Sequence, residues 1–180
     1  RKIKGVAGSG KTLVLAKLAV ENFIRTKENV LIFTYNLSLV NYIHDRLNDI
    51  RETYPWSNFK LLNYHQFFKA EANNHGLPIS DFSDWDNQLF FEPVKNQIKK
   101  YQTIIIDEVQ DYKSGWLKII EKYFLAENGR YIVFGDEKQN IYTRPLDENK
   151  FPVVPGISGR WNTSLNINFQ NSHFPIFERL

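Results

Sequence analysis

Apolar residues cluster along the chain in short runs that alternate with longer periodic stretches, a pattern typical of strands separated by helices. Four runs rich in β-branched and aromatic residues, each bounded by turn residues, predict strands at 30–34, 59–62, 103–106 and 131–134. Three periodic stretches predict helices at 13–24, 39–50 and 116–123. The first of these is apolar on nearly all sides, as expected of a helix that packs on a sheet.

Strands that alternate with helices pair in parallel through right-handed crossovers. The chain is therefore predicted to be an α/β domain with a mostly parallel sheet and helices on both faces. The segment 69–101 interrupts this alternation, because residues 73–88 are polar and rich in turn residues. We predict a short polar insertion there, in which a loop leads to a helix at 88–100 that begins or breaks at Pro93.

Composition places the chain among globular proteins of one domain. Its 180 residues are 42% hydrophobic and 24% charged, enough to bury one core. No apolar run reaches the length of about 18 residues that a membrane span requires, and the chain has neither cysteine nor an apolar signal segment at its start. We therefore expect no membrane association, no disulfide and a cytoplasmic location. The net charge of +3 allows a polyanionic partner without requiring one.

Residues 5–12 read GVAGSGKT and fit the phosphate-binding pattern G-x-x-x-x-G-K-[ST], with the first predicted helix directly behind it. The glycines let backbone N–H groups turn toward a phosphate, Lys11 reaches the β- and γ-phosphates, and Thr12 can hold Mg²⁺. A glycine-rich turn that merely precedes a helix is the simpler alternative, and the apolar helix at the required place argues against it. The residues predicted to bind the nucleotide are Gly5, Gly8, Ser9, Gly10, Lys11 and Thr12.

A second half of a phosphate site follows the strand at 103–106. That strand ends in Asp107 and Glu108, and ligands gather at the carboxyl ends of strands in open α/β sheets. Asp107 is predicted to serve Mg²⁺, and Glu108 to orient and deprotonate the attacking water. Taken alone, the acidic pair would be interpreted as a solvated turn; combined with the glycine loop, it indicates one site.

The strand at 131–134 supplies a third candidate. It is followed by Gly135, Asp136 and then Gln139, whose amide would reach the γ-phosphate if this strand lies beside the one that ends at Asp107. Gln139 is therefore predicted to bind the nucleotide and to take part in catalysis by sensing the γ-phosphate. An ordinary surface amide is the competing interpretation.

These motifs, in this order, resemble the first RecA-like motor domain of superfamily 1 helicases of the UvrD/Rep type. GVAGSGKT is similar to motif I of that family, residues 107–111 (DEVQD) to motif II, and residues 135–142 (GDEKQNIY) to motif III. The resemblance covers most of the chain. It implies a RecA-like P-loop NTPase fold over 1–180 and an ATP-dependent DNA helicase or translocase, an enzyme that couples hydrolysis of Mg·ATP to movement on a single strand.

The resemblance also implies contacts with nucleic acid. Residues 33–36 are similar to motif Ia, and residues 64–67 to an aromatic-His-x-Phe motif. By analogy, Thr34, Asn36 and His65 contact phosphates of single-stranded DNA, and Tyr64 and Tyr142 stack or wedge against bases. RNA stays open as an alternative strand.

Three features depart from the family pattern. Leu165, Asn168, Phe169, Asn171 and Ser172 resemble motif IV of the family, but Gln170 stands where that motif has an arginine, and a neutral amide cannot replace its charge. The insertion at 69–101 is too short for the accessory domain of the large family members. The chain ends soon after motif IV and has no methionine, so we expect a fragment whose partner is a second RecA-like domain and whose activity alone is low.

Two other functions stay open on the sequence. One is a P-loop ATPase that works as a switch or a nuclease partner without unwinding a duplex. The other is a degenerate nucleotide-binding module, for which Gln170 is the main argument.

Overall fold

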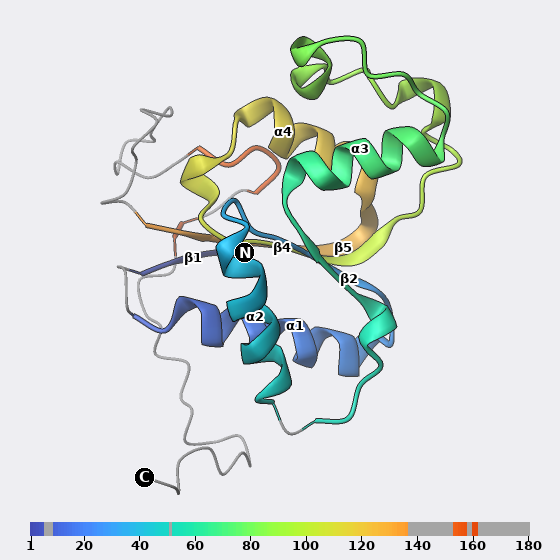
Figure 1. Ribbon diagram of the computed structural model, residues 1–180. Coiled ribbons are helices and arrows are strands. Elements are labelled where there is room, and N and C mark those ends of the chain that lie inside the picture. The colour runs from blue at the N-terminus through green and yellow to red at the C-terminus, as the bar shows by residue number, and fades with distance from the viewer. Residues whose placement is uncertain (6–8, 51, 137–152, 158–159, 162–180) are drawn as a thin grey trace, which may run out of the picture.

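The strands of the computed structural model form one parallel sheet (Figure 1). The structure describes residues 1–5, 9–50, 52–136, 153–157 and 160–161. The sheet has the order β1-β5-β4-β2-β3, and every neighbouring pair is parallel. Its strands are β1 (Lys2–Lys4), β2 (Val30–Phe33), β3 (Phe59–Leu62), β4 (Tyr101–Ile106) and β5 (Leu125–Gly135).

Helices cover both faces of this sheet (Figure 1). One face carries α1 (Lys11–Thr26) and α2 (Ser38–Asn48), and the other carries α3 (Tyr64–Asn74) and α4 (Ser114–Ile119). The turn η5 (Ile120–Phe124) prolongs α4 with π-helical geometry. The predicted α/β fold, with a parallel sheet between helices, is confirmed, and it is a P-loop NTPase-like arrangement.

Two hydrophobic clusters result from the two-residue period of the strands. Ile105 of β4 points to the cluster under α1 and α2, whereas Ile104 and Ile106 point to the cluster under α3 and α4. All three side chains are fully buried. Continuous apolar runs are what a parallel sheet buried on both faces requires, which is why the four predicted strands were visible in the sequence.

Four elements differ from the prediction. β1 was not predicted, because Ile3 is its only apolar residue. β5 begins at Leu125, before the predicted start at 131, since Leu125 pairs with Tyr101 across an irregularity in the ladder. α3 was not predicted; it begins at Tyr64 behind the N-cap Asn63, whose side chain accepts a hydrogen bond from the backbone N–H of Gln66.

The fourth difference lies in the polar insertion, where the helix predicted at 88–100 is wrong. That stretch has a single 3₁₀ turn, η3 (Glu92–Val94), among other turns. Pro93 lacks a backbone N–H, so it is tolerated only in the first turn of a helix and would interrupt a helix that starts at residue 88. Phe90 and Phe91, adjacent in sequence, both pack on Phe68 of α3, with ring centroids 4.7 and 4.9 Å away. Aromatic packing thus holds the insertion against α3.

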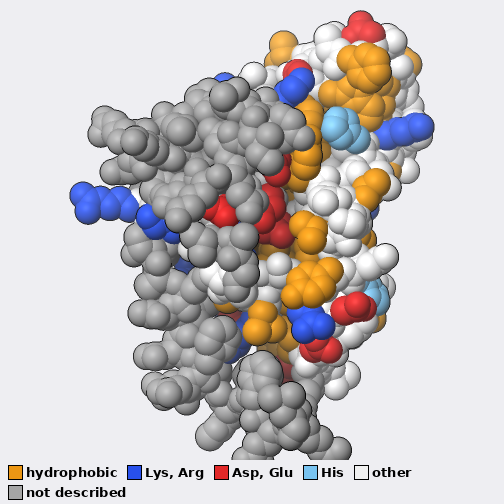
Figure 2. Space-filling view, turned by 60° about the vertical axis from the view of Figure 1, so that its left-hand side comes forward, with side chains coloured by type: hydrophobic (Ala, Val, Ile, Leu, Met, Phe, Trp, Pro, Cys, Tyr) orange, Lys and Arg blue, Asp and Glu red, His pale blue; other side chains and the backbone are white. Residues whose placement is uncertain are grey.

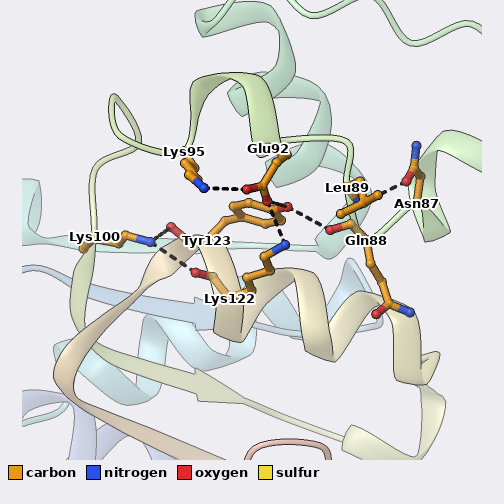
Figure 3. A network of polar contacts seen from close by, with 8 residues as sticks. All are labelled: Asn87, Gln88, Leu89, Glu92, Lys95, Lys100, Lys122 and Tyr123. Carbon is orange, nitrogen blue, oxygen red and sulfur yellow. Dashed lines mark hydrogen bonds and ion pairs between the residues drawn. The ribbon is translucent and has the colours of Figure 1, made fainter.

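Polar contacts tie the same insertion to the turn η5 (Figure 3). The carboxylate of Glu92 accepts hydrogen bonds from Lys122 at 2.7 Å and from Lys95 at 2.6 Å. The hydroxyl of Tyr123 lies 2.8 Å from both Glu92 Oε2 and the carbonyl oxygen of Gln88. The bonds from Lys122, Lys95 and Tyr123 lower the pKa of Glu92 to about 2. The insertion is therefore held against the element that follows α4.

No helix within the described part of the chain has the length and apolar character that crossing a bilayer requires.

Candidate functional site: a phosphate-binding edge of the sheet

The parallel sheet brings three chain segments to one edge. Lys4 is in register with Gly135, and Val133 with Ile106, so β1, β5 and β4 end side by side. The residues that leave these strands are Gly5, Asp136 and Asp107. β5 lies between β1 and β4, so the segment that follows β5 also belongs to the site.

Lys11, the first residue of α1, lies at the centre of this edge. Its side chain is only 6% exposed, and its ammonium donates a hydrogen bond to the carbonyl oxygen of Gly5 at 2.7 Å. Lys11 Nζ also lies 3.8 Å from Glu108 Oε1 and 3.8 Å from Asp136 Oδ2. The structure therefore brings together the glycine loop and the acidic pair, which are about a hundred residues apart in sequence.

The entry to α1 depends on glycine at one position. Gly10 has a φ of 82°, in the left-handed region that L-residues other than glycine avoid. A Cβ there would meet none of the described residues within 4 Å, so among them the requirement is conformational rather than steric. Ser9, just before it, has a hydroxyl oxygen that is buried and without a hydrogen-bond partner among the described residues. Thr12 is partly buried in the first turn of α1, and Gly8 lies outside the described residues.

Asp107 is buried at the end of β4, and 2% of its surface is exposed. Burial and then the neighbouring charge of Glu108 raise the pKa of Asp107 to about 7, against the opposing effect of Lys11. Its carboxylate accepts a hydrogen bond from the backbone N–H of Glu108 at 3.1 Å. Among the described residues, the carboxylates of Glu108 and Asp136 thus lie near the ammonium of Lys11, whose charge also acts on Asp107. Figure 2 shows acidic side chains gathered in the middle of one face of the molecule.

The carboxylates of Asp107, Glu108 and Asp136 lie at one edge of the sheet, and their negative charge suits a divalent cation. Among the described residues, no group of three or more histidine, cysteine or carboxylate side chains is arranged to hold a metal ion unaided. Mg²⁺, however, is usually bound by one or two protein groups together with phosphates and water. The sequence predicts the hydroxyl of Thr12 and the carboxylate of Asp107 for this role, and the structure places Thr12 in the first turn of α1 and Asp107 at the end of β4.

Glu108 is held in an unusual backbone conformation, with a φ of 50°. Gln110 donates a hydrogen bond from its side-chain amide to Glu108 Oε2 at 2.6 Å, and the amide oxygen of Gln110 accepts one from the backbone N–H of Asp136 at 3.1 Å. The sequence analysis gave no role to Gln110 or Asp136. The available signal was their position: each lies within four residues of the end of a strand that reaches the site.

Besides the cluster around Lys11, this edge of the sheet has a hollow of about 540 Å³, which we call the second hollow. It lies next to the residues that follow β2 and β3. It is lined by Tyr35, Asn36, Leu37, Asn63, Tyr64, His65, Asp111 and Trp116. Asp111 ends the turn η4 (Val109–Asp111), which starts directly after Glu108. The two parts of the edge are therefore joined by one short segment of chain.

Two residues predicted to contact nucleic acid line this hollow and are exposed. The side-chain oxygen of the exposed Asn36 accepts a hydrogen bond from the backbone N–H of Ser38 at 3.0 Å. His65 lies at the start of α3, with its ring 4.7 Å from that of Trp116. Burial and the charge of Lys113 lower the pKa of His65, which favours a neutral imidazole at pH 7.

Two other residues predicted to contact nucleic acid are buried in this structure. Thr34 has no exposed surface, and its hydroxyl donates to the carbonyl oxygen of Asn36 at 3.3 Å. Tyr64 is 2% exposed, and its ring stacks on Trp116 with centroids 4.7 Å apart. Both residues support the wall of the hollow, because a strand end and a helix start pack them inward. Gln139, Tyr142 and Gln170 lie outside the described residues.

Comparison with known proteins assigns this arrangement to a family and to a fold. The sequence model of the AAA_19 family, described as an AAA domain, matches residues 2–145. No curated protein matches the chain. Among solved structures, the UvsW helicase from bacteriophage T4 is similar in fold, with a TM-score of 0.50 and 14% identity over 77% of this chain and 48% of that one. The chain thus matches about half the length of that helicase.

Replacing Asp107 by asparagine should raise the melting temperature of the nucleotide-free protein near pH 8 and leave it unchanged near pH 4. Burial raises the pKa of Asp107 to about 7 from 3.8, so the cost of its charge develops as the pH rises between these values. Melting temperatures of both proteins, measured without divalent cations across this range, check the prediction.

Asp45→Asn, a change at an exposed position of α2, is the matched control and should follow the wild type. A melting temperature of Asp107→Asn that lies below the wild type near pH 8 would contradict the charge cost assigned to this carboxylate.

Proposed function

The chain belongs to the AAA_19 family of AAA domains, P-loop NTPases, and we propose that it is the ATP-binding motor domain of a UvrD-like superfamily 1 helicase or translocase. In this proposal, hydrolysis of ATP drives movement on single-stranded nucleic acid. One observation carries the proposal. The segment from Asp107 to Asp111 has its first two residues in the phosphate-binding edge and its last residue in the wall of the second hollow. Asp107, at the nucleotide end of this segment, is thus only four residues from Asp111, which lines the second hollow.

The nucleotide half of the proposal assigns tasks to the charged groups Lys11, Glu108 and Asp107. The ammonium of Lys11, paired with two carboxylates in this structure, would bind the phosphates of ATP instead. The unpartnered hydroxyl of Ser9 and the N-terminal turn of α1 add donors for the same phosphates. Glu108 would take the proton of the attacking water. Thr12 and Asp107 would hold Mg²⁺, which supplies neutralisation of the phosphate charge.

The nucleic-acid half rests on the chemistry of the second hollow. Asn36, Asn63 and His65 offer polar groups for phosphates or base edges, and the partly exposed Tyr35 offers aromatic surface. No lysine or arginine lines the hollow in the described part of the chain. Binding there would depend on hydrogen bonds and stacking more than on ion pairs, so its affinity should fall only weakly with salt.

Coupling between the halves requires that η4 moves with Glu108. The ring of Tyr112, directly after η4, packs edge-on against Tyr35 of the hollow, with centroids 6.0 Å apart. Directed movement also needs a second domain that opens and closes on this one through the nucleotide cycle. A partner RecA-like domain is therefore part of the proposal, as is the preference for ATP and for DNA.

The first test concerns Lys11. Lys11→Ala in the full-length protein should lower nucleic-acid-stimulated ATP turnover by at least about 100-fold, because the phosphates lose their buried cation. Lys118→Ala, at an exposed position of α4, is the control and should turn over ATP as the wild type does. Equal stimulated turnover in Lys11→Ala and wild type would refute the site. ATP binding without any turnover in the wild type would favour a degenerate nucleotide-binding module.

The second test concerns the hollow. His65→Ala should weaken binding of a fluorescent single-stranded oligonucleotide by about 10-fold, the loss expected for one stacking or hydrogen-bonding contact. Titrations with DNA and RNA of one sequence, at two salt concentrations, measure it.

Gln66→Ala is the control, since Gln66 is the next residue of α3, is exposed and does not line the hollow. Unchanged affinity in His65→Ala, or an equal loss in both variants, would place the strand elsewhere. Stimulated ATP turnover without displacement of a paired strand would favour a P-loop switch over a helicase.

A further inference from the structure

We infer that Gln110 is a positioning residue. Its side-chain amide is anchored to Asp136, at the end of β5, and sets the orientation of the Glu108 carboxylate. The inference rests on the proposed function in one respect, namely that Glu108 acts on the attacking water. The observations themselves are geometric: Gln110 is 1% exposed and has both ends of its side-chain amide engaged in the site.

The two hydrogen bonds of Gln110 leave its amide a single orientation. The backbone N–H of Asp136 can only donate, so it must face the amide oxygen of Gln110, at 3.1 Å. The NH₂ group therefore faces Glu108 Oε2, at 2.6 Å, and a carboxylate can only accept from it. Reversing the amide would break both contacts, so its orientation follows from its two neighbours.

Glu108 is thereby held between two partners. Its Oε2 atom accepts from Gln110, and its Oε1 atom lies 3.8 Å from the ammonium of Lys11. Without the amide, the strongest attraction left to the carboxylate is the buried ammonium. A closer pair with Lys11 would occupy the cation that the phosphates need and turn the carboxylate away from the water. Gln110 therefore keeps the carboxylate of Glu108 from moving closer to the ammonium of Lys11.

Asp136 links this arrangement to the phosphate-binding loop. Its carboxylate lies 3.8 Å from Lys11 Nζ, and its backbone N–H is the anchor of Gln110. One residue at the end of β5 is thus in contact with the lysine directly and with Glu108 through a single amide. A displacement of this strand end changes the surroundings of both groups together, which makes Gln110 the link between strand position and the orientation of the base.

The test is Gln110→Glu in the full-length protein. The new side chain has the same length and keeps an oxygen to accept from Asp136, but it places a second oxygen against Glu108 in place of the donor. We expect the kcat of nucleic-acid-stimulated ATP turnover to fall by about 10- to 100-fold, as for a catalytic group displaced by about 1 Å. The KM for ATP and the affinity for a non-hydrolysable analogue should stay within about twofold of the wild type.

Gln97→Glu is the matched control, because it adds the same charge at an exposed position, and it should leave kcat unchanged. A second variant addresses folding: the exchange Glu108→Gln/Gln110→Glu restores one amide and one carboxylate. It should recover the melting temperature of the wild type but not its turnover, since the base then stands at the wrong position.

The outcomes separate this inference from the function on which it rests. If Glu108→Gln abolishes turnover while Gln110→Glu keeps the kcat of the wild type, the positioning role is overturned and the proposed function stands. If Gln110→Glu lowers kcat, analogue affinity and melting temperature together, Gln110 is structural and the inference is likewise overturned. If Glu108→Gln retains wild-type turnover, the assignment of Glu108 fails in the proposed function itself.

Discussion

The pairing of one buried ammonium with buried carboxylates is the interaction on which the functional edge of this protein depends. Lys11 is surrounded by Glu108, Asp136 and the carbonyl oxygen of Gly5. Neither Lys11 nor Asp136 could be buried alone at acceptable cost, because an unpaired buried charge is strongly destabilising. The parallel sheet resolves this by ending three strands at one edge, so that residues far apart in sequence compensate one another.

The negative charge of Asp107 is not fully compensated by these contacts, and this suits the site to a bound substrate. Burial and the charge of Glu108 raise the pKa of Asp107 well above that of a free aspartate, which means that its negative charge is costly here. A cation bound with the phosphates would relieve that cost. The left-handed backbone of Glu108 is a further local cost at the same place. Strained and poorly compensated groups of this kind are common where a protein sacrifices stability for function.

Much of this could be predicted from the sequence, for identifiable reasons. A sheet buried on both faces produces apolar runs such as 103–106, and the glycine loop is constrained by backbone geometry that only a few residue types permit. The encounter of Lys11 with Glu108 followed from strand ends alone and is observed. The roles given to these residues stay predictions until nucleotide and nucleic acid are tested directly.

Other features depend on tertiary packing that local patterns do not encode. Thr34 and Tyr64 have residue types suited to contacting a strand, yet the strand end and the start of α3 turn them inward. The helix predicted at 88–100 failed because Phe68 and Tyr123, distant in sequence, hold that segment in another shape. The sequence analysis gave Gln110 no role, because its position near a strand end does not reveal its two partners, Glu108 and the backbone N–H of Asp136.

A crystal structure of the protein with Mg²⁺ and a non-hydrolysable ATP analogue tests the central claim most directly. The account predicts that Lys11 Nζ leaves its neighbours Glu108 and Asp136 and lies within hydrogen-bond distance of the β- and γ-phosphates, above the ends of β1, β5 and β4. A triphosphate bound elsewhere, with the contacts of Lys11 unchanged, would contradict it.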